Sequence, residues 1–284
     1  MIFDGRAFAR EIEATLRQRL RSGVRVPKIV SVLVGDDPAS ILYTKLKKAA
    51  AERVGILFEI YHYTNEPLDH LSNKIQEIGA SGDVTGVMVQ LPIPGLHGHA
   101  LQEVLATIPR DKDVDGLRWE ESGVMPATVR AVLSIVDKII ESQIINSQIL
   151  KSGNYVVLGA RGAVGRPLVH FLRKRGLEVA EVEWDTPEPT RIILAGEVVI
   201  SCVGKAGIVI GEMVKEGVVA IDVGMSEKKI SNHKFSNSQI NTVVGDMTQE
   251  VYQKASVAVP VPGGVGPVTV ASLMANAAEI TKKV

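Results

Sequence analysis

The chain has 284 residues, of which 32 are Lys or Arg and 32 are Asp or Glu, so its formal net charge is zero at pH 7. This balance excludes a bulk electrostatic attraction to nucleic acid or to an anionic membrane, and we expect neither as a partner. The sequence shows no uncharged apolar run of bilayer length and no apolar core of a signal peptide, which predicts a cytoplasmic protein. The length suits two domains, each with its own core.

Short apolar runs alternate with helical segments through the first half of the chain. A helix that Asp4 can cap comes first. Strands are predicted at residues 29–34, 56–61 and 86–90, and helices are predicted at residues 40–53 and 68–78. This alternation predicts a mostly parallel sheet with helices on its faces.

The second half repeats the alternation after a long amphipathic helix predicted at residues 129–140. Strands are predicted at residues 155–158, 178–183, 198–203, 218–223 and 242–244, all in a second parallel sheet. The run 260–267 holds three glycines and three prolines and leads into a helix predicted at residues 270–281. The chain is therefore expected to be an α/β protein of two domains, each a mostly parallel sheet with flanking helices.

Polar residues of the first half lie where strands are predicted to end or helices to begin. Tyr43 and Lys47 are four residues apart, so they share one face of the helix that follows the first strand. Gln90 ends the third strand, and open α/β sheets bind ligands at the carboxyl ends of their strands. A solvated charged face explains the lysine spacing as well, so these residues alone leave both interpretations open.

The predicted strand at residues 155–158 runs straight into a glycine-rich turn ahead of a helix. The turn reads Gly159-Ala160-Arg161-Gly162-Ala163-Val164-Gly165. Glycines allow close backbone approach, and exposed amides at the start of a helix attract anionic oxygens, so the turn indicates a dinucleotide phosphate site. Its spacing differs from the common G-x-G-x-x-G pattern.

Two other residue types that often carry chemistry are not assigned a role. His97 and His99 lack a nearby Cys or carboxylate at ligand spacing, so no metal site is expected. The single cysteine, Cys202, falls in a predicted apolar strand and is expected to be a buried thiol rather than a nucleophile.

Short motifs occur in a fixed order along the whole chain. The first half holds S-x-x-Y-x-x-x-K at 40–47, V-Q-L-P at 89–92 and K-D-V-D-G at 112–116. The second half holds V-G-x-P at 164–167, D-V-G at 222–224, G-D at 245–246 and P-V-P-G-G-V-G-P at 260–267. Each motif is weak alone, but together they resemble the bifunctional methylenetetrahydrofolate dehydrogenase/methenyltetrahydrofolate cyclohydrolases.

The resemblance implies an enzyme that oxidises 5,10-methylenetetrahydrofolate to 5,10-methenyltetrahydrofolate with NAD(P)+ and hydrolyses this product to 10-formyltetrahydrofolate. It implies that Lys47 is the general acid/base and that Gln90 orients it. Tyr43 would stack on the aminobenzoyl ring, and Asp115 would accept hydrogen bonds from the pterin. Further folate-binding positions that it implies are Leu91, Pro92, Pro262 and Gly263.

The coenzyme-binding positions implied by the resemblance are Gly159, Ala160, Arg161, Gly162, Val164, Gly165, Trp184, Val203, Gly204, Gly224 and Met225. Many members read G-R-S-x-x-V-G at the turn, whereas this chain has Ala160 and Arg161 at the Arg and Ser positions. Glu183 and Asp185 stand where basic or hydroxyl groups would hold a 2′-phosphate, and acids there favour the free ribose diol of NAD. Family frequency favours NADP, and the residues keep NAD open.

The resemblance also implies how the chain is organised. Residues 1–124, completed by the last helix at about 265–284, are expected to bind folate and catalyse, and residues 125–264 are expected to form a Rossmann-type NAD(P)-binding domain. A homodimer is expected, as in the family. Three alternatives stay open: a cyclohydrolase without coenzyme binding, a non-catalytic folate- or nucleotide-binding protein, and an NAD-dependent dehydrogenase for another small substrate.

Overall fold

The computed structural model describes residues 1–22, 25–64, 66–142, 147–231 and 239–282. Its contacts divide the chain into two compact units, each made of two stretches of sequence. The first unit holds Ala9–Ala127 and Val270–Val284, and the second unit holds Met1–Phe8 and Thr128–Thr269. No helix within the described ranges is long and apolar enough to cross a membrane.

The first eight residues belong to the second unit, whereas the sequence analysis expected them in the first domain, at residues 1–124. Ile2 forms a parallel bridge with Ala258. The N–H of Phe3 donates to the carbonyl of Ala258 at 2.8 Å. These backbone bonds attach the start of the chain to a strand of the second sheet.

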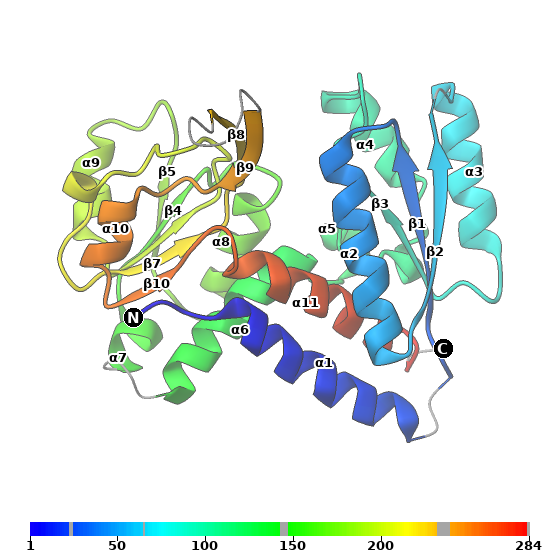
Figure 1. The fold of residues 1–284 in the computed structure, drawn as a ribbon, viewed down its shortest axis with the longest axis horizontal. Coiled ribbons are helices and arrows are strands. Elements are labelled where there is room, and N and C mark those ends of the chain that lie inside the picture. Colours follow the sequence, from blue (N-terminus) through cyan, green and yellow to red (C-terminus); the bar gives the residue numbers. More distant parts are fainter. Residues whose placement is uncertain (23–24, 65, 143–146, 232–238, 283–284) are drawn as a thin grey trace. The chain divides into compact units, whose positions relative to one another are not determined.

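The first unit is built on a three-stranded parallel sheet in the order β2-β1-β3 (Figure 1). Its strands are β1 (Lys28–Val34), β2 (Leu57–Tyr63) and β3 (Gly86–Val89), which confirms the three predicted strands. Strand β1 lies between the other two and is buried from its second residue to its last. A strand covered on both faces needs apolar residues at successive positions, which explains the continuous run in the sequence.

The helices of this unit begin and end at local sequence signals. Helix α2 (Pro38–Val54) starts where the Asp37 carboxylate accepts the N–H of Ser40 at 2.8 Å, with Pro38 at its first position. It ends at Gly55, whose φ of 86° is left-handed and suits glycine. The helix therefore begins two residues before the predicted start at Ser40.

The remaining helical segments of the first unit, with those that cross the division, are α1 (Gly5–Arg21), α3 (Leu68–Ala80), α4 (Gly98–Ala106), η1 (Arg110–Lys112), α5 (Trp119–Ser122) and α11 (Val265–Ile280). The Asp4 side chain caps α1 by accepting the N–H of Ala7 at 2.9 Å, as predicted. Helix α11 begins five residues earlier than predicted, inside the run of glycines and prolines. The division between the units falls within α1, within α11 and after Ala127, the first residue of the helix at Ala127–Ser142.

Apolar side chains of β1 alternate between two cores, one on each face of the sheet. Ile29 packs in a cluster with Leu16 of α1, Ala51 of α2 and Leu273 of α11. Val30 and its neighbours on the opposite face pack with residues of α3 and α4, namely Leu71, Ile75, Val104 and Leu105. The sheet is therefore covered on both sides, as an all-parallel sheet requires.

The second unit is built on a five-stranded parallel sheet in the order β10-β7-β6-β4-β5. Its strands are β4 (Tyr155–Leu158), β5 (Val179–Val182), β6 (Val198–Ser201), β7 (Val219–Asp222) and β10 (Val257–Val259). Its other helical segments are α6 (Ala127–Ser142), α7 (Ser147–Ser152), α8 (Gly165–Lys174), α9 (Pro189–Ala195), η2 (Gly211–Met213) and α10 (Gln249–Lys254). The strand order corresponds to 2-1-4-5-6 of the Rossmann sheet, which confirms the expected fold class.

One strand prediction in this unit is wrong. Residues 242–244 lie in β9 (Gln239–Val244), which pairs antiparallel with β8 (Ser226–Ser231) in a separate two-stranded sheet. The place beside β7 is taken by β10, a short strand that the sequence did not predict. An apolar run predicts a strand, but its partner depends on which neighbours offer free backbone groups.

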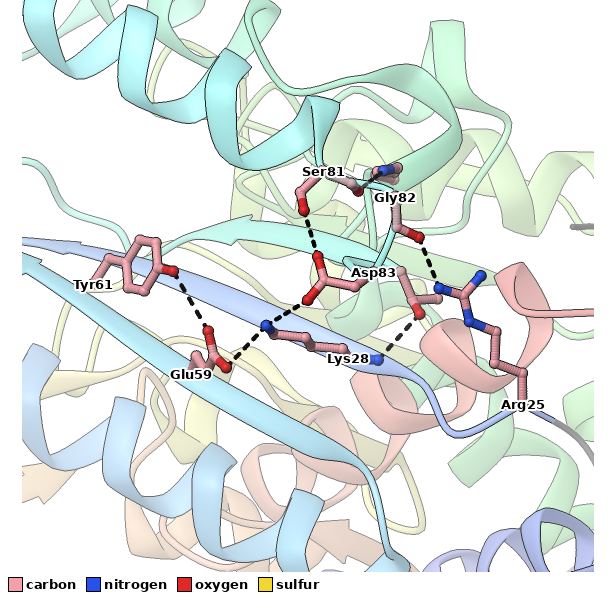
Figure 2. Close-up of polar contacts among 9 residues, drawn as sticks. Arg25, Lys28, Glu59, Tyr61, Ser81, Gly82 and Asp83 are labelled. Carbon is pink, nitrogen blue, oxygen red and sulfur yellow. Dashed lines mark hydrogen bonds and ion pairs between the residues drawn. The ribbon is translucent and has the colours of Figure 1, made fainter.

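A polar network ties together the amino ends of the strands in the first unit (Figure 2). Lys28 of β1 forms ion pairs with Glu59 of β2 at 2.9 Å and with Asp83, just before β3, at 2.8 Å. Its ammonium lowers the pKa of the Asp83 carboxyl to about 2. Arg25 donates to the carbonyl of Gly82 at 2.7 Å. These contacts occupy one end of the sheet, and the polar residues singled out in the sequence lie at the other.

A buried asparagine fixes the connection that follows the sheet. Asn276 of α11 is 2% exposed, and its Nδ2 donates to the carbonyls of Val114 and Met125, at 3.0 Å each. Val114 lies in the K-D-V-D-G loop, and Met125 lies between α5 and α6. One side chain thus satisfies two backbone acceptors that packing alone would leave without a donor.

We expect Asn276→Leu to lower the free energy of unfolding by about 3 kcal/mol, because two carbonyls lose their donor inside the protein. The measurement is urea denaturation followed by circular dichroism. Asn73→Leu in α3 is the matched control, since Asn73 is exposed, and it should change stability by no more than about 0.5 kcal/mol. Equal midpoints for the two variants would contradict the assigned role.

Candidate functional site

Lys47 is set apart from the lysines beside it. The neighbouring Lys45 and Lys48 are exposed, whereas the Lys47 side chain is only 13% exposed. Its Nζ donates to Oε1 of Gln90 at 3.0 Å and lies 3.9 Å from Oδ2 of Asp115. The structure therefore brings together three of the residues predicted for the site, and Lys47 does not belong to a solvated charged face.

Gln90 is held so that its oxygen faces the lysine. It follows β3, where its N–H donates to the carbonyl of Val32 at 2.8 Å. Its side-chain Nε2 donates to the carbonyl of Leu91 at 2.8 Å. Because Lys47 can only donate, the amide must present Oε1 to it, and the bond to Leu91 fixes this orientation.

The two aspartates of the K-D-V-D-G motif have different tasks. Asp113 is fully buried, and its carboxylate accepts from the N–H groups of Leu117 and Arg118 at 2.9 Å each and from Ser122 Oγ at 2.8 Å. Burial raises the pKa of Asp113, while these hydrogen bonds favour its charged form. Asp113 thus folds the loop, and Asp115, with a side chain 19% exposed, faces Lys47.

The environment of Lys47 changes its acid–base behaviour. Burial lowers the pKa of the Lys47 amine, and the Asp115 carboxylate opposes this effect. The amine therefore loses its proton more readily than a free lysine, while it keeps a hydrogen-bond acceptor in Gln90. An amine whose pKa is lowered in this way is suited to general acid and base chemistry.

The other predicted folate-binding residues lie on the elements that carry Lys47 and Gln90 or belong to the second unit. Tyr43 lies one helical turn before Lys47 on α2 and is half-buried. Leu91 and Pro92 follow Gln90 directly and are joined by a cis peptide bond. Pro262 and Gly263 belong to the second unit, between β10 and α11.

The glycine turn of the second unit folds tightly onto the start of α8. A Cβ on Gly165 would lie 2.0 Å from the carbonyl oxygen of Gly159, so only glycine permits this approach. Gly159 itself has a φ of 72°, which a larger residue rarely adopts. Arg161, Gly162 and Ala163 form an exposed tip. A closed turn with an exposed tip at a helix start fits the diphosphate of a dinucleotide.

The loop after β6 is held by a buried carboxylate that the sequence analysis did not assign. Asp246 is fully buried and accepts from Ser201 Oγ at 2.7 Å. It also accepts the backbone N–H groups of Val203, Gly204 and Lys205, at 2.8, 3.2 and 2.8 Å. Val203 and Gly204 were predicted to bind the coenzyme, so Asp246 fixes the shape of a predicted binding loop.

A second carboxylate supports the first. Asp222 accepts the N–H of Met247 at 2.9 Å and the hydroxyl of Tyr252 at 2.6 Å, and burial raises the pKa of Asp222 to about 6. Both acids come at the ends of apolar runs, in the D-V-G and G-D motifs. Asp222 is the last residue of β7, and Asp246 lies two residues beyond β9. An acid at or just beyond the end of an apolar run was the signal that could have identified them.

The coenzyme positions predicted from the sequence lie at one edge of the second sheet. They occupy the loops that follow β4, β5, β6 and β7, which are adjacent in the sheet. Gly204 is linked to the stretch after β7 by the hydroxyl of Ser226, which donates to the Gly204 carbonyl at 2.9 Å. Cys202 follows β6 and is partly buried, and desolvation raises the pKa of its thiol, which disfavours a nucleophilic role.

Comparisons with known proteins match both parts of the chain. Residues 3–115 match the tetrahydrofolate dehydrogenase/cyclohydrolase catalytic domain, and residues 126–284 match the NAD(P)-binding domain of the same family. Bifunctional protein FolD 2 of Lactobacillus johnsonii is 36% identical over 297 residues, which cover 99% of this chain and 98% of that protein.

Two solved structures show the same fold over nearly their whole length. The bifunctional FolD enzyme of Campylobacter jejuni has a TM-score of 0.84 at 30% identity and covers 100% of this chain and 99% of its own. FolD of Trypanosoma brucei, solved with NADP cofactor and an inhibitor, has a TM-score of 0.85 at 29% identity and covers 100% and 97%. The motifs, the two sheets and these matches agree, and the chain belongs to the tetrahydrofolate dehydrogenase/cyclohydrolase family, as its sequence predicted.

Proposed function

We propose that this chain oxidises 5,10-methylenetetrahydrofolate with NAD(P)+ and hydrolyses the resulting 5,10-methenyltetrahydrofolate to 10-formyltetrahydrofolate. The observation that carries the proposal is the Lys47 amine, largely withdrawn from water and 3.0 Å from the Gln90 oxygen. Catalysis and the folate contacts of Tyr43, Leu91, Pro92 and Asp115 belong to the part of the chain that matches the catalytic domain. Coenzyme binding, with the folate contacts of Pro262 and Gly263, belongs to the part that matches the NAD(P)-binding domain. We further propose that the protein is cytoplasmic and that it forms a homodimer. Light scattering after gel filtration tests the dimer by its mass.

The oxidation step removes hydride from a carbon between two nitrogens and leaves a cation shared by the N–C–N unit. The coenzyme supplies the hydride acceptor. No proton moves in this step, so Lys47 is not required as a base. We assign Tyr43 to stacking on the aminobenzoyl ring and Asp115 to accepting the pterin N–H donors. Leu91, Pro92, Pro262 and Gly263 complete the proposed folate contacts.

The hydrolysis step needs proton transfer. Water adds to the cationic carbon, the bond from this carbon to N5 breaks, N5 gains one proton and a second proton is released. Lys47 is the general base for the water and then returns a proton to N5. The cationic substrate lowers the pKa of the Lys47 amine further, since like charges disfavour each other. Gln90 holds the amine through an uncharged acceptor, which leaves it free to give up its proton.

The alternative of a cyclohydrolase without coenzyme binding is less well supported. The turn departs from the pattern of many members at Ala160 and Arg161, but its backbone still closes onto α8 between Gly159 and Gly165. The loop at 203–205 is also held in a single shape by Asp246. Parallel assays of oxidation and of hydrolysis test the proposal, and hydrolysis without oxidation would favour the alternative.

We expect Lys47→Met to lower the rate of methenyltetrahydrofolate hydrolysis by about 10²- to 10⁴-fold, because the general base is lost while the side-chain volume is kept. Oxidation should suffer much less, since it moves no proton. The exposed Lys48→Met is the matched control and should retain both activities. Hydrolysis at the parental rate in Lys47→Met would refute the role of Lys47.

We expect Gln90→Glu to shift the pH profile of hydrolysis to the alkaline side by about 1 to 3 pH units. The parental rate should rise as the pH passes the lowered pKa of Lys47, because the neutral amine is the base. In Gln90→Glu the new carboxylate favours the charged amine and raises the pKa of Lys47, so the rate of hydrolysis should rise at a higher pH. The profile is measured after subtraction of the uncatalysed rate. Gln90→Leu, which removes the acceptor without adding charge, should not show an alkaline shift.

We expect Asp246→Asn to lower kcat/KM of the oxidation for the coenzyme by about ten- to a hundredfold, since an amide presents Nδ2 to donors that need an acceptor. Hydrolysis should stay within about twofold, because Asp246 lies outside the matched catalytic domain. Glu212→Gln, which removes an exposed acid of the same unit, serves as control. An equal loss of both activities would indicate general unfolding instead.

A further inference from the structure

We propose that this enzyme prefers NAD+ to NADP+ and that Glu183 determines the preference, by accepting a hydrogen bond from the 2′-hydroxyl of the adenosine ribose. The inference rests on the proposed oxidation and deepens it, because it specifies the coenzyme. It is carried by the contacts that this chain makes between the glycine turn and the end of β5.

Glu183 stands at the position from which a Rossmann domain reads the ribose. It follows the last residue of β5, and β5 lies beside β4 in the sheet. The N–H of Gly159 donates to the carbonyl of Val182 at 2.9 Å, which joins the start of the turn to the end of β5. A carboxylate at the end of the second strand, about 20 residues after the first glycine, binds the ribose hydroxyl of NAD.

The Glu183 carboxylate also faces the turn rather than bulk solvent. The backbone N–H of Arg161, at the exposed tip of the turn, donates to Oε1 of Glu183. The N–H of Glu183 donates to Thr186 Oγ1 at 2.7 Å, which fixes the backbone on the other side. The acid is therefore held next to the predicted phosphate site, and a 2′-phosphate there would meet a like charge.

Arg161, the base nearest to Glu183, is itself paired with an acid. The Arg161 guanidinium pairs with Asp185, with Nη1 3.0 Å from Oδ2 and 3.2 Å from Oδ1. Two carboxylates and one guanidinium leave a net negative charge at the end of β5. Arg173, which lies near this strand, pairs with Glu181 at 2.8 Å. A 2′-phosphate would have to compete with these carboxylates for each guanidinium.

An exposed tryptophan next to Glu183 provides a reporter. Trp184 is 92% exposed, an unusual state for so large an apolar side chain, and it follows Glu183 directly. Its ring offers a flat apolar surface at the place where the adenosine would lie. Changes in its fluorescence can therefore report binding without any turnover. Trp119, in the first unit, is replaced by Phe so that Trp184 is the single indole.

The kinetic experiment compares kcat/KM for NAD+ and NADP+ in methylenetetrahydrofolate oxidation by the full chain. We expect the parent to prefer NAD+ by more than about tenfold and Glu183→Ser to shift the ratio toward NADP+ by about tenfold or more. Glu183→Gln, which keeps the shape and removes the charge, should shift it in the same direction. Glu178→Gln removes an exposed acid just before β5, at the opposite end of the strand, and should leave the ratio unchanged.

The binding experiment titrates Trp119→Phe protein with 5′-AMP and with adenosine 2′,5′-bisphosphate and follows Trp184 fluorescence. The fragment without the 2′-phosphate should bind more tightly in the parent, and Glu183→Ser should remove or reverse this order. Tighter binding of the bisphosphate by the parent, an order that Glu183→Ser leaves unchanged, or binding of neither fragment would overturn the inference.

The outcomes separate this inference from the proposed function. Oxidation that prefers NADP+ overturns the coenzyme assignment and leaves the bifunctional reading intact. No oxidation with either coenzyme, together with the expected order of fragment binding, contradicts the proposed oxidation and supports the role of Glu183.

Discussion

The withdrawal of the Lys47 amine from water is the constraint on which the chemistry proposed for the first unit depends. Burial disfavours the charged amine, and the Asp115 carboxylate favours it, so the two effects set its basicity between them. Gln90 supplies the acceptor that a buried amine requires and adds no charge of its own. Helix α2, the end of β3 and the loop containing Asp115 must all be in place for this balance to hold.

Buried carboxylates fix the loops that follow the strands of both sheets, where few apolar side chains are available for packing. Asp113 gathers two backbone N–H groups and a hydroxyl in the first unit, and Asp246 gathers three N–H groups and a hydroxyl in the second. A loop at the carboxyl end of a strand has polar backbone groups and few apolar side chains. One buried acid can satisfy several of its donors at once, which gives the loop a single shape. The binding surfaces proposed for folate and for the coenzyme are both shaped by such buried carboxylates.

The parts of the fold that depend on local chemistry were predictable from the sequence. Gly55 marks the end of α2 by a left-handed φ, and Asp37 and Pro38 mark its start by capping and by a fixed φ. Each signal acts within a few residues, although the predicted start at Ser40 came two residues late. The motifs identified Lys47 and Gln90, and the structure places these two in contact. The loops proposed to bind the coenzyme lie together because they follow adjacent strands of the second sheet.

The remaining features depend on partners distant in the sequence. Residues 242–244 read as a strand, but nothing local states that they pair with β8 and that β10 takes the place beside β7. The two aspartates of K-D-V-D-G have equivalent neighbours in sequence, and only the fold shows which one is buried. The role of Arg161 in the glycine turn also depends on residues more than twenty positions away. Arg161 pairs through its guanidinium with Asp185, and its backbone N–H donates to Glu183. The altered turn and the acids that follow β5 therefore form one interacting feature, in which the base that would attract a phosphate is occupied by the acids that would repel it.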